Sequence, residues 1–98
     1  MIVIACYDIE NDKIRERVAN KLLDFGLERI QFSVFVGPLN RFQFQKLRIA
    51  IEKILSGYPK SNLLIIPLSG FGKSNVYHCG DAEPDWEYLT GKKLTLIL

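Results

Sequence analysis

The chain has 98 residues, of which 48% are hydrophobic and 24% are charged, and its formal net charge is +2 at pH 7. These values predict one globular domain over residues 1–98 and exclude an intrinsically disordered chain. The net charge is too small to predict nucleic-acid binding by itself, so the positions of the basic residues decide that question.

The first third of the sequence predicts a strand and a helix. Residues 2–8 form an apolar strand that ends at Asp8, and either Asn11 or Asp12 can cap the helix that follows. Gly26 is suited to end this helix. Its core-facing residues recur at i, i+4, i+8 and i+11: Ile14, Val18, Leu22 and Phe25.

Residues 28–37 alternate as the residues of a β segment do. One predicted face carries Ile30, Phe32, Val34 and Val36, and the other carries Arg29, Gln31, Ser33 and Phe35. The segment contains no turn signal. Two possibilities remain: a kink or bulge near Phe32–Ser33 splits it into two strands, or it is one strand.

The rest of the chain predicts one more helix and three strands. Asn40 can cap a helix that runs to about Leu55. The strands are expected at 62–68, 75–80 and 93–98. The final strand has no helix after it to cover it, so it must pair with its own sheet or with that of a partner.

This order of elements predicts an α+β sandwich with two helices on one face of a sheet. The opposite face would then need cover, and a second copy of a chain this short would supply it in a symmetric dimer. Met1 leads into apolar residues without a basic leader, and no run is long enough to cross a bilayer. We interpret Cys6 and Cys79 as reduced core thiols of a cytoplasmic protein.

Asp8 is the strongest candidate for chemistry, because a strand end holds its backbone rigidly. Magnesium usually takes one or two carboxylates together with waters, and a two-fold axis near Asp8 would supply a second carboxylate. The metal could then activate water for attack on a phosphodiester. The alternative is that Asp8 only accepts hydrogen bonds from the first turn of the following helix.

Basic residues form a row on the first helix at i, i+4 and i+8: Lys13, Arg17 and Lys21. Such a row can follow nucleic-acid phosphates, and Arg29 could contribute. Alternatively, it is a solvated helix face balanced by Glu16 and Asp24. Arg15 falls within the apolar arc of the helix, so it must pair or reach past the helix end toward the end of the first strand.

Two weaker signals are set aside. Residues 71–74 (FGKS) look like the end of a phosphate-binding loop, but Pro67 stands where that loop needs glycine, and a strand is expected to follow. His78 with Cys6 and Cys79 cannot complete a tetrahedral zinc site within one chain. We interpret His78 as an ordinary strand histidine.

Over roughly residues 1–68, the sequence resembles the CRISPR-associated protein two family. The resemblance is carried by a strand ending in YDI, a basic amphipathic helix, the segment GLERIQFSVFVG and a second helix. Matching positions are Tyr7, Asp8, Arg15, Arg17, Arg29, Ile30, Gln31, Ser33, Val34 and Phe35. The resemblance implies a ferredoxin-like fold and a homodimer in which residues 93–98 pack on the partner's sheet. It also implies that Asp8 of both subunits binds Mg²⁺ in a shared cleft.

The resemblance further implies a Mg²⁺-dependent endonuclease, acting on RNA or DNA, that works with the CRISPR integrase during spacer acquisition. Asp8 would be its catalytic and metal-binding residue. The expected nucleic-acid-binding residues are Lys13, Arg15, Arg17, Lys21 and Arg29, supported by Tyr7, Gln31, Ser33 and Phe35. One alternative is a non-catalytic scaffold that bridges the integrase and holds duplex DNA. Another is a toxin-like ribonuclease of the virulence-associated type.

Overall fold

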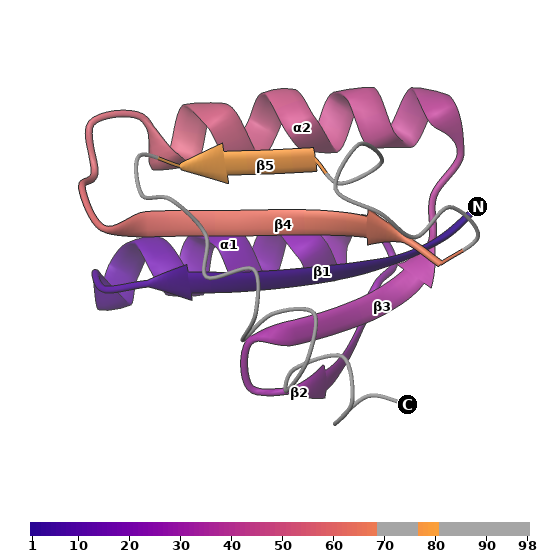
Figure 1. Cartoon of the computed structure of the whole chain (residues 1–98), viewed down its shortest axis with the longest axis horizontal. Coiled ribbons are helices and arrows are strands. Elements are labelled where there is room, and N and C mark those ends of the chain that lie inside the picture. Colours follow the sequence, from indigo (N-terminus) through magenta and orange to yellow (C-terminus); the bar gives the residue numbers. More distant parts are fainter. Residues whose placement is uncertain (69–76, 81–98) are drawn as a thin grey trace.

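A computed structural model describes residues 1–68 and 77–80 of the chain. Within this part, one antiparallel sheet carries two helices on one face (Figure 1). The elements are β1 Ile2–Ile9, α1 Asp12–Asp24, β2 Glu28–Gln31, β3 Val34–Pro38, α2 Arg41–Leu55, β4 Ser61–Pro67 and β5 Tyr77–Gly80. The strand order β2-β3-β1-β4-β5 is a ferredoxin-like sheet with β5 added beside β4. The predicted α+β fold class is confirmed, whereas the expected strand at 93–98 lies outside the described residues.

Both helices begin at the asparagines that the sequence indicates. Asn11, not Asp12, is the N-cap of α1, and its Oδ1 accepts a hydrogen bond from the Ile14 amide at 3.0 Å. Asn40 and Gln43 form a reciprocal capping box at the start of α2, with distances of 2.7 and 2.9 Å. These local hydrogen bonds fix where each helix leaves the sheet.

The β segment at 28–37 is split by a turn at residues 32–33, so the first of the two possibilities is correct. The predicted face that joined Ile30 and Phe32 to the two valines is wrong, because the turn reverses the chain. Ile30 is 42% exposed and Phe32 is 71% exposed, whereas Val34 is buried. β2 forms the edge of the sheet, and its pairing with β3 shifts register between Arg29 and Gln31.

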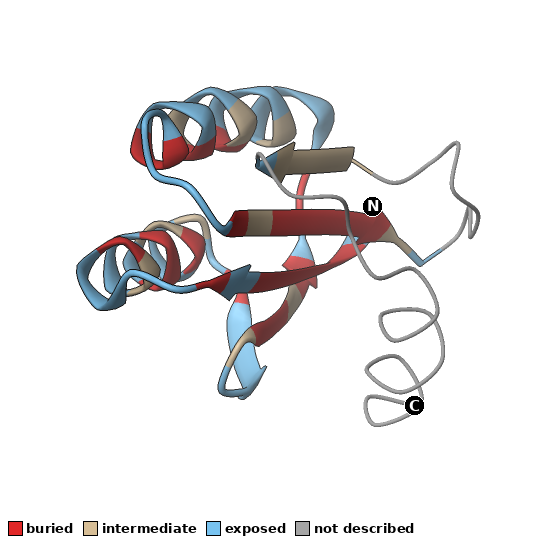
Figure 2. Ribbon diagram, turned by 60° about the vertical axis from the view of Figure 1, so that its left-hand side comes forward, coloured by how far each residue is buried: buried red, intermediate tan, exposed pale blue. Residues whose placement is uncertain are grey.

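The central strands are buried on both faces (Figure 2). On the helix side, one large apolar cluster joins β1, β3 and β4 to α1 and α2. A smaller cluster lies on the opposite face: Ile4, Cys6, Val34, Leu64 and Ile66. These five side chains are buried within the single chain, so their burial does not by itself require a second copy. The dimer stays a prediction.

Both cysteines are free thiols, as predicted, although Cys79 is only half-buried while Cys6 is buried. Neither of the two described helices is long and apolar enough to cross a membrane.

Gly80 lies where a Cβ atom would collide with the neighbouring strand, so its replacement should measurably lower the stability of the fold. Its φ is +137°, and a Cβ at this position would lie 2.0 Å from the Ser61 carbonyl oxygen. We expect Gly80→Ala to lower the free energy of unfolding by roughly 1–3 kcal/mol in urea denaturation. Gly57→Ala is the control, because Gly57 also has positive φ but nothing within 4 Å of the added Cβ. An equal loss in both variants would show that the contact with Ser61 is unimportant.

Candidate functional site

Asp8 lies near the end of β1, and its side chain is exposed. Because strand residues alternate between faces, Asp8 shares the face of Cys6, away from the helices. The cap position of α1 is occupied by Asn11. Within residues 1–68 and 77–80, no hydrogen bond or ion pair involves the Asp8 carboxylate. The alternative role of Asp8 as an acceptor for the first turn of α1 is therefore wrong.

Two residues on neighbouring strands extend this face beyond Asp8. Asn62 on β4 stands directly opposite Asp8 in the antiparallel register. His78 on β5 donates from Nε2 to Asn62 Oδ1, and it pairs in register with Leu64 of the same face. Asp8, Asn62 and His78 thus follow one another across three strands. His78 lies in a strand, as predicted, and its partner Asn62 was not among the predicted site residues.

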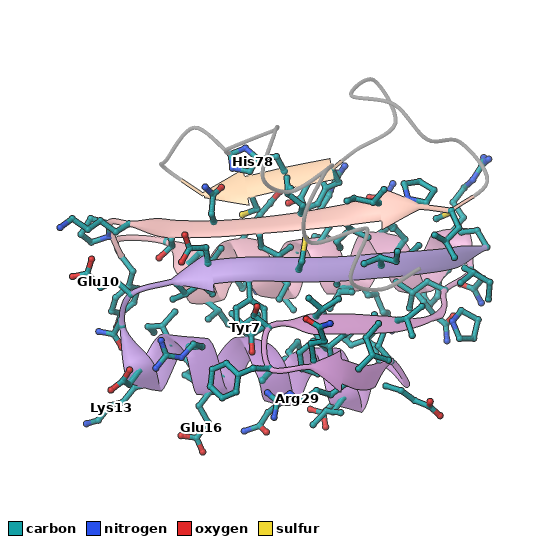
Figure 3. The ribbon with its side chains drawn as sticks, turned by 60° about the horizontal axis from the view of Figure 1, so that its bottom comes forward. Tyr7, Glu10, Lys13, Glu16, Arg29 and His78 are labelled. Carbon is teal, nitrogen blue, oxygen red and sulfur yellow. The ribbon has the colours of Figure 1, made fainter. Side chains whose placement is uncertain are left out.

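Tyr7 points to the helix side of β1, where it contacts the β2–β3 turn. Its hydroxyl donates to the Phe32 carbonyl oxygen at 3.3 Å and accepts from Arg29 Nη2 at 3.5 Å. The Tyr7 amide donates to the Ser33 carbonyl oxygen at 3.2 Å. Figure 3 shows Tyr7 and Arg29 on the side of α1, with His78 on the far side of the sheet. Tyr7 thereby ties the turn to the end of β1.

Arg15 reaches past the start of α1 to the end of β1, as predicted. Its Nη1 donates to the Ile9 carbonyl oxygen at 3.1 Å, and its Nη2 pairs with Asp12. The guanidinium carbon lies 5.8 Å from the centre of the Phe32 ring. The pair with Asp12 is largely exposed and contributes little stability, so these contacts chiefly fix the position of the guanidinium.

The basic row on α1 projects from the helix beside this turn. Lys13 and Arg17 are exposed and Lys21 is half-buried. In the part of the chain that the structure describes, none of the three forms an ion pair with Glu16 or Asp24. Figure 3 shows Lys13 and Glu16 directed outward from α1. Among residues 1–68 and 77–80, the three positive charges are therefore not neutralised by direct pairing, which suits a surface that meets phosphates.

The predicted supporting residues divide into surface and core positions. Arg29 and Gln31 are exposed, Ser33 is half-buried, and Phe35 is completely buried. The Arg29 guanidinium lies 4.9 Å from the centre of the Phe35 ring. Phe35 therefore supports Arg29 from within the core and is shielded from any ligand.

The structure brings Tyr7, Arg15 and Arg29 together around Phe32 and directs Asp8 to the other face of β1. Tyr7 and Asp8 are nevertheless consecutive residues of β1, so the cluster around Phe32 and the Asp8 carboxylate share one end of that strand. β3 starts opposite Cys6, so beyond that point the β2–β3 turn flanks Tyr7. A nucleic acid that crosses the end of β1 can meet both groups.

The residues at Asp8 fit a magnesium ion with few protein ligands. Among the described residues, no group of three or more His, Cys, Asp and Glu side chains could hold a metal ion. Magnesium does not need such a group, because it usually keeps several waters and takes one or two carboxylates. Asp8 offers an exposed carboxylate that has no partner among the described residues, and the side-chain oxygen Oδ1 of Asn62 is already hydrogen-bonded to His78.

The other reactive side chains of β5 do not extend this site. Burial raises the pKa of the Cys79 thiol, so the thiol stays protonated and is a poor nucleophile. Burial also raises the pKa of Tyr77, whose hydroxyl donates to Glu52 at 2.8 Å. Both residues pack against the helix-side cluster, on the face opposite Asp8.

Comparison with known proteins gives a consistent picture. The family described as CRISPR associated protein Cas2 matches residues 1–75. A CRISPR-associated endoribonuclease Cas2 2 of Chloroflexus aurantiacus is 39% identical over 66 residues, which are 67% of this chain and 78% of that protein. A CRISPR-associated endoribonuclease Cas2 of Aeropyrum pernix is 30% identical over 97% of both chains. The crystal structure of a hypothetical protein from Thermus thermophilus aligns with a TM-score of 0.63 and 34% identity, covering 70% of this chain and 82% of that one.

Proposed function

Since the chain belongs to the CRISPR-associated protein Cas2 family, we propose that it is an endoribonuclease that cleaves RNA with Mg²⁺ held at Asp8. The observation that carries the proposal is the Asp8 carboxylate itself. It is exposed and, among the described residues, unpaired, and it stands at the end of a strand whose neighbouring residues are buried. The names of the relatives support RNA as the substrate class.

In this mechanism, a bound Mg²⁺ would lower the pKa of a water and offset negative charge on the scissile phosphate. Asp8 would hold the ion, and β1 and β4 fix the backbone of Asp8 on the face shared with Asn62. Arg15 is held against Ile9 with its guanidinium already positioned, so it can orient a phosphate at small entropic cost. Arg17 and Lys13 extend the positive surface along α1.

We propose that the active form is a homodimer. A single Asp8 supplies one carboxylate, and a two-fold axis near the end of β1 would bring a second one from the partner. Membership of the family supports a place beside the CRISPR integrase during spacer acquisition. The competing proposal, a scaffold that holds duplex DNA, needs the basic row but not Asp8.

Cleavage of labelled single-stranded RNA and labelled duplex DNA by the purified protein, with Mg²⁺ and with EDTA, tests this function. RNA cleavage that requires Mg²⁺ is the expected result. Binding of duplex DNA with no cleavage of either substrate would overturn the endoribonuclease and favour the scaffold.

The basic row is expected to set the salt dependence of RNA binding. Replacing Lys13, Arg17 and Lys21 by glutamine should reduce the slope of log affinity against log salt by about 2, since each phosphate contact on a single strand contributes about 0.7. Fluorescence anisotropy in EDTA would measure the slope. The control removes the same charge from α2, where Arg41, Lys46 and Lys53 are also exposed. An equal change in both triple variants would mean that only net charge matters.

A further inference from the structure

Phe32 is an aromatic side chain that the fold leaves in solvent. It lies in the turn between β2 and β3, and its 71% exposure is the highest among the large hydrophobic residues that the structure describes. Its backbone is nevertheless held, because the Tyr7 hydroxyl donates to its carbonyl oxygen at 3.3 Å. The ring is therefore presented on a fixed turn, not on a loose loop.

Two guanidinium groups from different elements approach this ring. The guanidinium carbon of Arg15 on α1 lies 5.8 Å from the ring centre, and that of Arg29 on β2 lies 5.7 Å away. Both distances are within the range of a cation–π contact. An exposed ring flanked by two permanent positive charges combines an apolar plane with groups that bind phosphate.

Both arginines are positioned before any ligand arrives. Arg15 donates to the Ile9 carbonyl oxygen and pairs with Asp12. Arg29 donates to the Tyr7 hydroxyl, and its guanidinium carbon lies 4.9 Å from the centre of the buried Phe35 ring. Since these contacts restrict the long side chains in advance, less conformational entropy is lost when a ligand binds.

We propose that Phe32 is the platform on which one unpaired nucleobase of the RNA stacks, while Arg15 and Arg29 hold the adjoining phosphates. This inference rests on the proposed action on RNA and specifies single-stranded RNA as the form that is bound. An unpaired base can leave its neighbours and stack on an aromatic ring, whereas a base inside a duplex is already stacked on both sides.

Charge favours a nucleobase over a second copy of the chain as the group that covers Phe32. A two-fold contact centred on this ring would bring Arg15 and Arg29 of both copies together, and four like charges would oppose the association. The phosphates beside a nucleobase carry the opposite charge and would be attracted instead.

The test compares Phe32→Leu with Phe42→Leu. Phe42 is the matched control, because it is 67% exposed and has Lys46 Nζ 4.7 Å from its ring centre, but it lies in the first turn of α2, beyond the opposite end of β3. Both rings are exposed, so both variants should fold. Affinities for a labelled single-stranded RNA, and for an abasic oligonucleotide of equal length, would be measured by fluorescence anisotropy in EDTA.

Phe32→Leu should weaken RNA binding about tenfold and leave binding of the abasic oligonucleotide unchanged, since stacking contributes roughly 1–3 kcal/mol per base. Phe42→Leu should change neither affinity. Equal RNA affinity of Phe32→Leu and the wild type would overturn the platform. An equal loss for both oligonucleotides would also overturn it, since Phe32 would then act only by positioning the arginines.

Cleavage by the wild-type protein in Mg²⁺ separates this inference from the proposed function. Wild-type cleavage combined with unchanged RNA binding by Phe32→Leu would overturn the platform alone. Failure of the wild type to bind or cleave RNA would overturn both. Sedimentation at the same concentrations would identify a third case: loss of a dimer in Phe32→Leu alone would assign the ring to a contact between copies.

Discussion

Asp8→Asn is expected to lower the rate of Mg²⁺-dependent RNA cleavage by roughly 100-fold or more, a loss of about 3 kcal/mol in transition-state stabilisation. The substitution keeps the size of the side chain and removes the negative charge that would hold the ion in the proposed mechanism. Because Asp8 is exposed and has no partner among the described residues, stability should be unchanged. RNA affinity in EDTA should also stay the same, and single-turnover cleavage would measure the effect.

Glu10→Gln is the matched control for this experiment. Glu10 lies two residues beyond Asp8, also carries an exposed carboxylate, and pairs with Lys60 at 3.5 Å across an exposed contact worth little energy. The Glu10→Gln variant should cleave RNA at the wild-type rate. Full activity in Asp8→Asn would refute the proposed metal site, and loss of dimerisation in that variant would make Asp8 a structural residue.

Several features of the fold could be predicted because their causes are local. The caps at Asn11 and Asn40 depend on residues within one helical turn, and the sequence displays them directly. The position of Arg15 could be predicted from the periodicity of the first helix. A charged side chain within the apolar arc, near the helix start, is expected to extend toward the adjacent strand end.

The sequence left two possibilities for residues 28–37, and it could not decide for the turn at residues 32–33 because the cause of that turn is not local. Residues 28–36 contain none of the Gly, Pro or Asn residues that usually mark a tight turn. The turn is held from outside, by the hydroxyl and the amide of Tyr7. The alternation rule, applied across this turn, placed Phe32 on the same face as Val34 and Val36, although Phe32 carries the most exposed of the described aromatic rings.

Asn62 and His78 escaped prediction for a related reason. Neither lies in a recognisable motif, and they join Asp8 only through the register of β4 against β1 and of β5 against β4. The first of these registers joins strands more than fifty residues apart in the sequence, and both are set by packing of the whole sheet, so one sequence does not display them.

Phe35 is expected to have a large effect on stability. Phe35→Ala should lower the free energy of unfolding by about 3–5 kcal/mol, because the ring is completely buried and its removal leaves a cavity in the helix-side cluster. The ring packs 6.0 Å from that of Tyr7, and its neighbours in the sheet are Ala5 and Arg29. Urea denaturation would measure the loss.

Phe35→Leu separates this structural role from a role at the active site. Leucine keeps most of the apolar volume, so the loss of stability should be about 1.5 kcal/mol or less and the protein should stay folded. Its RNA cleavage should then stay near that of the wild type, because a side chain with no exposed surface cannot touch the substrate. A stable Phe35→Leu protein that has lost cleavage would contradict this assignment. Phe35 would then act through Arg29, whose guanidinium rests on its ring.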